Sequence, residues 1–124
     1  MKCKIEAETR VCPTEDLDKV IKAFSNIFEY EELEIGKDYI MISSECSSLK
    51  YLKKFMEKKK IRDTARVIFL KGTKNNIIRF KLSKQAAYVG NINLVEENLS
   101  PLGEINVQIK TKDPLRLIEW LCEH

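Results

Sequence analysis

The chain has 124 residues, of which 44% are hydrophobic and 33% charged, with a formal net charge of +3 at pH 7. This length predicts one domain, residues 1–124, that can bury its own core without staples, and the composition excludes an intrinsically disordered chain. The longest apolar runs, 39–42 and 67–70, are far shorter than the roughly 20 residues of a membrane span, so we expect no membrane association.

The first third of the chain predicts a strand and a helix. Apolar and charged residues alternate over 2–11, as is typical of a half-buried strand. Pro13 ends this strand, and Thr14 is expected to cap a helix whose acidic first turn suits the positive end of the helix dipole. The apolar face of that helix, at helical spacing, is Leu17, Val20, Ile21, Phe24, Ile27 and Phe28.

A hairpin and a lysine-rich helix are expected next. Strands over 32–36 and 39–44 flank a turn that contains Gly36. Ser47 or Ser48 is expected to open the second helix. Its predicted inward residues are Leu49, Leu52, Phe55 and Met56, and its predicted outer residues are Lys50, Lys53, Lys54, Glu57 and Lys58.

The middle of the chain predicts a third helix and a further strand. Asp63 is expected to cap the helix, which runs through Lys71 and is closed by Gly72; the β-branched and aromatic run 67–69 leaves a strand as the alternative. Residues 78–82 alternate as a strand with an apolar inside and a basic outside.

The C-terminal part predicts an acidic, turn-rich link through Pro101, a last strand over 105–109, and a helix that starts at Asp113-Pro114. The resulting order, β-α-β-β-α-α-β-β-α, predicts an α+β fold. We expect a two-layer sandwich in which helices cover one face of a mainly antiparallel sheet.

Charge is strongly segregated along the sequence. Of the 22 basic residues, 13 lie between Lys50 and Lys84 together with only two acids, for a net charge of +11, whereas the other 89 residues carry −8. A concentrated positive field attracts polyanions. A basic surface that serves only solubility is the alternative, but such surfaces usually mix both signs, so the segregation favours contact with nucleic acid.

The candidate RNA-contacting side chains come from the second helix, the third helix, the basic strand and the turn that follows it. If these elements are neighbours, their cations form one continuous patch along RNA phosphates, which position a protein without reading sequence. Two amides of the turn would add hydrogen bonds, although a tight turn in which they satisfy local backbone groups is the alternative. The set is Lys50, Lys53, Lys54, Lys58, Lys59, Lys60, Arg62, Arg66, Arg79, Lys81, Lys84, Gln85 and Asn91.

Other functional classes receive little support from the sequence. The one histidine is the last residue, His124, and four glycines assemble no phosphate-binding loop, so we expect no enzyme and no cofactor. The cysteines show no C-x-x-C pairing, so we expect no metal site and reduced, mostly buried thiols. The N-terminus lacks the apolar stretch of a signal peptide, so we expect a cytoplasmic protein. The cysteines are Cys3, Cys12, Cys46 and Cys122.

Three motifs resemble those of a known family. They are Pro13-Thr14-Glu15-Asp16 after the first strand, Lys84-Gln85-Ala86-Ala87 with Val89-Gly90, and Leu102-Gly103-Glu104-Ile105 at the start of the last strand. They are similar to an uncharacterised archaeal protein family that is grouped with predicted RNA-binding, exosome-associated proteins. The resemblance implies RNA as the partner and a fold like that of ribosomal protein L-five, which binds the small ribosomal RNA of the large subunit. This chain has Ser83 where the family motif has Asn.

We therefore expect a non-catalytic protein that contacts structured RNA through the basic stretch from Lys50 to Lys84, in RNA processing or ribosome-related assembly. Protein partners within an RNA-processing assembly are a further expectation. One alternative is an interaction module whose basic face docks an acidic protein. A less favoured alternative is a small-ligand or hydrolytic function at the turn from Lys84 to Asn93.

Overall fold

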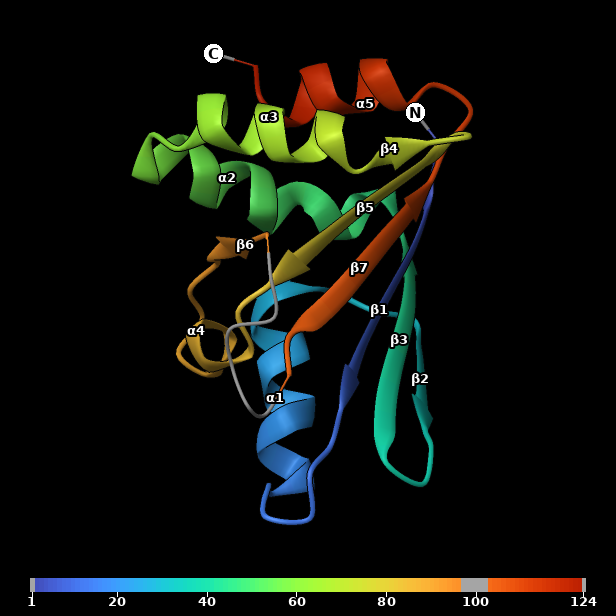
Figure 1. The fold of residues 1–124 in the computed structure, drawn as a ribbon, viewed down its shortest axis with the longest axis vertical. Coiled ribbons are helices and arrows are strands. Elements are labelled where there is room, and N and C mark those ends of the chain that lie inside the picture. Colours follow the sequence, from blue (N-terminus) through green and yellow to red (C-terminus); the bar gives the residue numbers. More distant parts are fainter. Residues whose placement is uncertain (1, 97–102, 124) are drawn as a thin grey trace.

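The structure, a computed structural model, describes residues 2–96 and 103–123. These residues form an α+β fold with an antiparallel sheet, as the sequence predicted. The structure has five α-helices and an open sheet of seven strands (Figure 1). The strands are β1 (Lys4–Arg10), β2 (Glu32–Ile35), β3 (Tyr39–Glu45), β4 (Thr73–Lys74), β5 (Ile77–Leu82), β6 (Leu94–Val95) and β7 (Ile105–Lys110). The helices are α1 (Leu17–Ile27), α2 (Lys50–Lys59), α3 (Arg62–Lys71), α4 (Lys84–Tyr88) and α5 (Pro114–Leu121), with a 3₁₀ turn, η1 (Cys46–Leu49), before α2.

The sheet places the first and the last strand of the chain side by side. Its strand order is β2-β3-β1-β7-β5-β4, with β6 paired to the far end of β5. The N-terminal strand β1 is therefore central, between β3 and the C-terminal strand β7. Because successive strand residues point to opposite faces, Ile5 and Ala7 enter the core while Glu6 and Glu8 lie on the outer face of the sheet.

One hydrophobic core lies between the inner face of the sheet and the helices. α1 buries Val20 and Phe24 against it, and α3 buries Phe69, whose ring meets that of Phe80 on β5 edge to face with centroids 4.9 Å apart. Figure 1 shows α2, α3 and α5 gathered at one end of the sheet and α1 at the other.

Several predicted boundaries need correction. α1 is capped by Asp16, whose side chain accepts from the backbone N–H of Asp18, and not by Thr14. Asp63 lies in the first turn of α3, two positions past the N-cap residue Ile61. The segment is a helix, which decides against the strand alternative. The short elements β4, β6 and α4 were not expected. The predicted link through Pro101 lies outside the described residues, as does His124.

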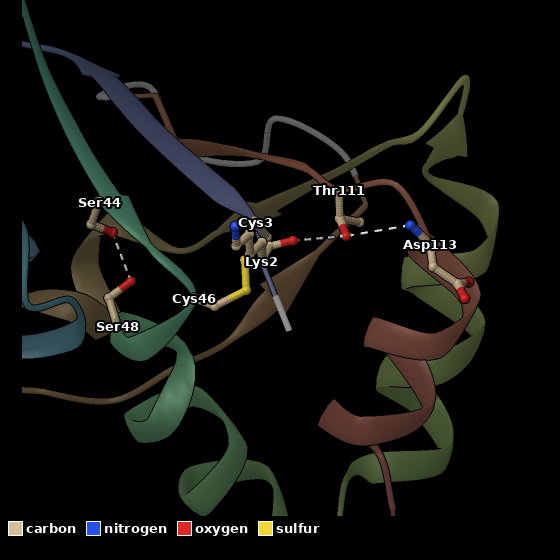
Figure 2. The surroundings of a disulfide bond; sticks show 7 residues. All are labelled: Lys2, Cys3, Ser44, Cys46, Ser48, Thr111 and Asp113. Carbon is tan, nitrogen blue, oxygen red and sulfur yellow. Dashed lines mark hydrogen bonds between the residues drawn. A yellow bond between two sulfur atoms is a disulfide. The ribbon is translucent and has the colours of Figure 1, made fainter.

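The expectation of reduced cysteines is wrong for one pair. Cys3 and Cys46 form a disulfide, with their Cα atoms 5.2 Å apart (Figure 2). The antiparallel register that pairs Lys4 with Glu45 sets the two cysteines side by side just beyond the ends of β1 and β3. The bond therefore joins the start of the chain to η1, although 43 positions separate its cysteines.

Candidate nucleic-acid interface

The exposed cations of α2 form a compact basic surface, which we call the α2 lysine face. Lys50, Lys54 and Lys58 are exposed at spacing i, i+4, i+8, so they form one row with a step of about 6 Å along the helix. Lys59, whose ammonium lies 5.9 Å from the centre of the Phe55 ring, and the C-cap residue Lys60 add two exposed cations beside this row at the C-terminal end, where cations are favoured by the helix dipole. The opposite side of α2 buries Leu52 and Met56. The α2 lysine face is thus Lys50, Lys54, Lys58, Lys59 and Lys60.

Two predicted RNA contacts hold α5 in place. The ammonium of Lys53 lies 3.1 Å from Glu123 Oε1, donates to the carbonyl oxygen of Trp120, and sits 4.9 Å from the centre of the Trp120 ring. Arg62 Nη1 donates to the carbonyl oxygen of Glu123 at 2.6 Å. Both cations therefore satisfy carbonyl groups at the C-terminal end of α5.

Arg66 is half-buried on α3, in the same neighbourhood as the C-terminal end of α5. Burial raises the pKa of the Cys122 thiol there, and the nearby charge of Arg66 partly offsets that rise. Arg66 is therefore only partly open to solvent.

Lys84 is a structural residue and is not accessible to a phosphate. Its side chain is fully buried, and its ammonium donates to the backbone oxygen of Arg10 at 2.6 Å and to both carboxylate oxygens of Glu15 at 3.1 and 3.2 Å. Tyr88 adds a hydroxyl that donates to Glu15 Oε2 at 2.8 Å, and the Cys12 backbone N–H donates to Oε1 at 2.9 Å. The prediction that Lys84 contacts RNA is therefore wrong.

The contacts in this cluster also shift the pKa values of Glu15 and Tyr88. Burial alone would raise the pKa of Glu15, but hydrogen bonds from Cys12, Tyr88 and Lys84 together hold it below the ordinary value. Burial and the Glu15 carboxylate raise the pKa of Tyr88, so the phenol stays protonated as a donor. The cluster ties α4 to the turn between β1 and α1.

The other predicted residues of this segment lie at the surface. Gln85 and Asn91 are exposed, at the start of α4 and after it. Ser83 caps α4 by accepting from the Ala86 backbone N–H at 3.2 Å, which is a role an Asn at this position also performs. The side chain of Asn26 on α1 donates to the carbonyl oxygens at the end of α4, a contact that the sequence pattern did not reveal.

The predicted cations of β5 lie apart from the α2 lysine face. Ile78, Phe80 and Leu82 enter the core beneath the helices, so Arg79 and Lys81 project from the outer face of the sheet. The strand alternation thus sends them to the side of the sheet opposite α2. The expected single patch through the helices and this strand does not form, and the basic stretch supplies two separate surfaces.

A cleft of about 470 Å³ opens on the outer face of the sheet beside Arg79 and Lys81. Its walls come from β1, β3, β5, β7, the end of α3 and the segment around β6. The alternation of apolar and polar residues in three of these strands indicates which side chains share the outer face. The sequence did not show which strands are neighbours, and so it did not predict the cleft. The lining is Glu6, Glu8, Met41, Ile68, Lys71, Gly72, Arg79, Phe80, Lys81, Val95, Glu96, Asn106, Val107 and Gln108.

The described residues contain no cluster of three or more histidine, cysteine or acidic side chains placed to hold a metal ion. Among residues 2–96 and 103–123, no helix is both long and apolar enough to cross a membrane.

Comparison with known proteins connects this geometry to a family. A family model described as RNA binding matches residues 4–111. A UPF0201 protein of Methanothermobacter thermautotrophicus is 40% identical over 119 residues, which cover 96% of this chain and 90% of that protein. A UPF0201 protein of Thermococcus kodakarensis is 43% identical over 125 residues, covering 96% of this chain and 88% of the relative.

Solved structures agree with this relationship. The crystal structure of a UPF0201 protein superposes with a TM-score of 0.85 at 32% identity, covering 98% of this chain and 94% of that one. The UPF0201 protein from Methanococcus jannaschii gives a TM-score of 0.79 at 30% identity, with 96% and 98% coverage. Both structural matches span nearly the whole of each chain, as do the matches to the two relatives above. They confirm the archaeal family that the sequence motifs suggested. The chain belongs to the UPF0201 family, and it matches the family model described as RNA binding.

Proposed function

We propose that this protein is a non-catalytic RNA-binding protein and that the α2 lysine face is its surface for RNA phosphates. The observation that carries the proposal is the row formed by Lys50, Lys54 and Lys58, with Lys59 and Lys60 at the C-terminal end of the same helix, whose acidic residue is Glu57 alone. Within the described residues, these five ammonium groups form no hydrogen bond or ion pair with the protein. The match to the RNA-binding family model supports the same reading.

The chemistry of the α2 lysine face favours recognition of RNA by its shape rather than by its base sequence. Lysine ammonium groups are flexible point charges, and they contact phosphates without reading bases. Structured RNA presents closely spaced phosphates to such a row. We therefore expect weak sequence specificity, and a cytoplasmic role in RNA processing or ribosome-related assembly.

The dependence of affinity on salt tests this proposal, because each phosphate contact releases condensed counterions. For five contacts, the slope of log affinity against log salt concentration should be about −3.5 to −4.5. Replacing Lys54, Lys58 and Lys59 with glutamate should flatten the slope by about 2–3 and weaken binding to all structured RNAs alike.

A matched control separates the local surface from the overall charge. Reversing Lys19, Lys22 and Lys112, which are exposed on other elements, changes the net charge by the same amount. That variant should keep most of the wild-type slope. If both triple variants lose affinity equally, the α2 lysine face is not the site. If the wild-type protein binds no RNA at low salt, where screening is weakest, the proposed function fails and docking of an acidic protein partner replaces it.

A further inference from the structure

The outer face of the sheet carries three parallel columns of polar side chains. The antiparallel register places Glu6 beside Gln108 and Gln108 beside Arg79 in one row. The next row is Glu8, Asn106 and Lys81. Acids therefore line β1, amides line β7 and cations line β5, and all six side chains line the cleft.

The columns have a fixed spacing. Neighbouring strands lie about 4.8 Å apart, so the carboxylates and the cations are separated by roughly 10 Å, with the amides midway between them. A ligand that spans the cleft thus meets a positive side, a row of groups that both donate and accept, and a negative side.

The end of α3 strengthens the positive side. The Arg79 backbone N–H donates to the Gly72 carbonyl oxygen at 2.9 Å, which draws the end of α3 against β5. A Cβ on Gly72 would lie 1.8 Å from the Arg79 carbonyl oxygen, so this approach requires glycine. Lys71, the residue before Gly72, consequently joins Arg79 and Lys81 around the cleft.

Apolar side chains complete the cleft. Ile68 lines it from α3, Val95 lines it from β6, and Met41 contributes from β3. A mainly apolar lining with a few oriented polar groups is typical of pockets for small organic groups, and a volume of about 470 Å³ lies within the usual range for them.

We propose that this cleft binds one unpaired nucleotide of an RNA strand, with a preference for guanosine. This inference rests on the proposed RNA-binding function and adds a second contact, on the side of the sheet opposite α2. The phosphate lies at Lys71 and Arg79, across the amide column from Glu6 and Glu8, which repel it.

The acidic column selects the base. A carboxylate only accepts hydrogen bonds, so Glu6 and Glu8 favour a base edge with adjacent donors. Guanine offers its ring N1–H and its 2-amino group together on one edge, whereas the other bases offer fewer adjacent donors there. Asn106 and Gln108 lie between the two columns, within reach of the ribose and the remaining base atoms. A base inside a duplex cannot present this edge, so the nucleotide must be unpaired.

The test uses short single-stranded oligouridine RNAs that contain one central guanosine or one central adenosine, with binding measured by fluorescence anisotropy. The wild-type protein should bind the guanosine strand about tenfold more tightly than the adenosine strand. Glu8→Gln should remove this preference. Arg79→Gln should weaken binding to both strands about three- to tenfold, as expected for one lost phosphate contact.

Two control variants match these changes outside the cleft. Glu45→Gln alters an exposed acid elsewhere on the outer face, and Lys74→Gln removes an exposed cation on β4. Both should behave as wild type. A 6-thioguanosine at the central position should crosslink on irradiation to peptides that contain Met41 or Ile68.

The outcomes separate the two proposals. If RNA binds but Glu8→Gln and Arg79→Gln behave like their controls, or crosslinks fall only on α2, the cleft inference is overturned while the proposed function stands. If no RNA binds at low salt, the proposed function itself fails. A guanosine preference that Glu8→Gln abolishes, with crosslinks in the cleft, supports the inference.

Discussion

Replacing Lys84 with methionine should strongly lower the free energy of unfolding of this protein, although the sequence places Lys84 among the surface cations of the basic stretch. Methionine has a similar length and prefers buried sites, so the change removes the charge while keeping most of the volume. The carboxylate of Glu15, whose side chain is only 4% exposed, then stays buried without its cation. The backbone oxygen of Arg10 also loses its donor.

The expected cost follows from this burial. Removing one partner of a buried ion pair destabilises a protein by about 3–5 kcal/mol, because the remaining charge is uncompensated. For a chain of 124 residues the unfolding entropy converts this into a fall in melting temperature on the order of 10–20 °C. A fall of this size is a large part of the stability of an ordinary domain.

Thermal and urea unfolding followed by circular dichroism measure the effect. Lys74→Met, on an exposed lysine of β4, is the matched control and should change stability by less than about 0.5 kcal/mol. The double variant Lys84→Met with Glu15→Gln should recover part of the loss, because it removes the buried negative charge. If Lys84→Met melts within a few degrees of wild type, the reasoning that makes this pair structural is refuted.

Three further predictions concern stability. Since the pKa of Glu15 is held below 4.5, the contribution of Glu15 to the free energy of unfolding is present above that pH and is lost as pH falls through the lowered pKa. Glu15→Gln should therefore make the free energy of unfolding depend less on pH in that range and should reduce stability at neutral pH. Cys3→Ser should lower the free energy of unfolding by about 4 kcal/mol under oxidising conditions, from the loop entropy of a 43-residue separation, and should have little effect when wild type is fully reduced. Phe24→Ala, at a fully buried position of α1, should cost about 3–5 kcal/mol in urea unfolding, and a change below 1 kcal/mol would show that α1 is not docked on the sheet.

Much of the fold was predictable because its main elements carry clear periodicity. The alternation in β1 and β5 and the helical spacing in α1 and α5 each identified an element of the right type. The elements that were missed, β4, β6 and α4, have two to five residues, too few for a period to show. The strand order was not predictable from local pattern, because pairing between β1 and β7 depends on contacts across the whole chain.

The disulfide and the buried ion pair escaped prediction for the same reason. Cys3 and Cys46 meet only because β1 and β3 pair in one register. Lys84 looked like one more cation of the basic stretch, and only the packing of α4 against the turn after β1 turns it toward Glu15. Sequence reasoning counted the lysines correctly and could not tell which of them were already engaged inside the protein.

The number of cations that can contact RNA depends on which basic side chains are already bonded within the protein. Of the 13 basic residues between Lys50 and Lys84, five form the α2 lysine face and three line the cleft on the other side of the sheet. Lys53, Arg62 and Lys84 are bonded to carbonyl oxygens or carboxylates of the protein itself. A net charge of +11 along the sequence therefore overstates the number of phosphates that any one surface can neutralise. For fully paired RNA, whose bases cannot enter the cleft, the salt dependence of binding should follow the five lysines of the α2 lysine face rather than the 13 cations of the stretch, because only charges that exchange counterions for phosphates contribute to it.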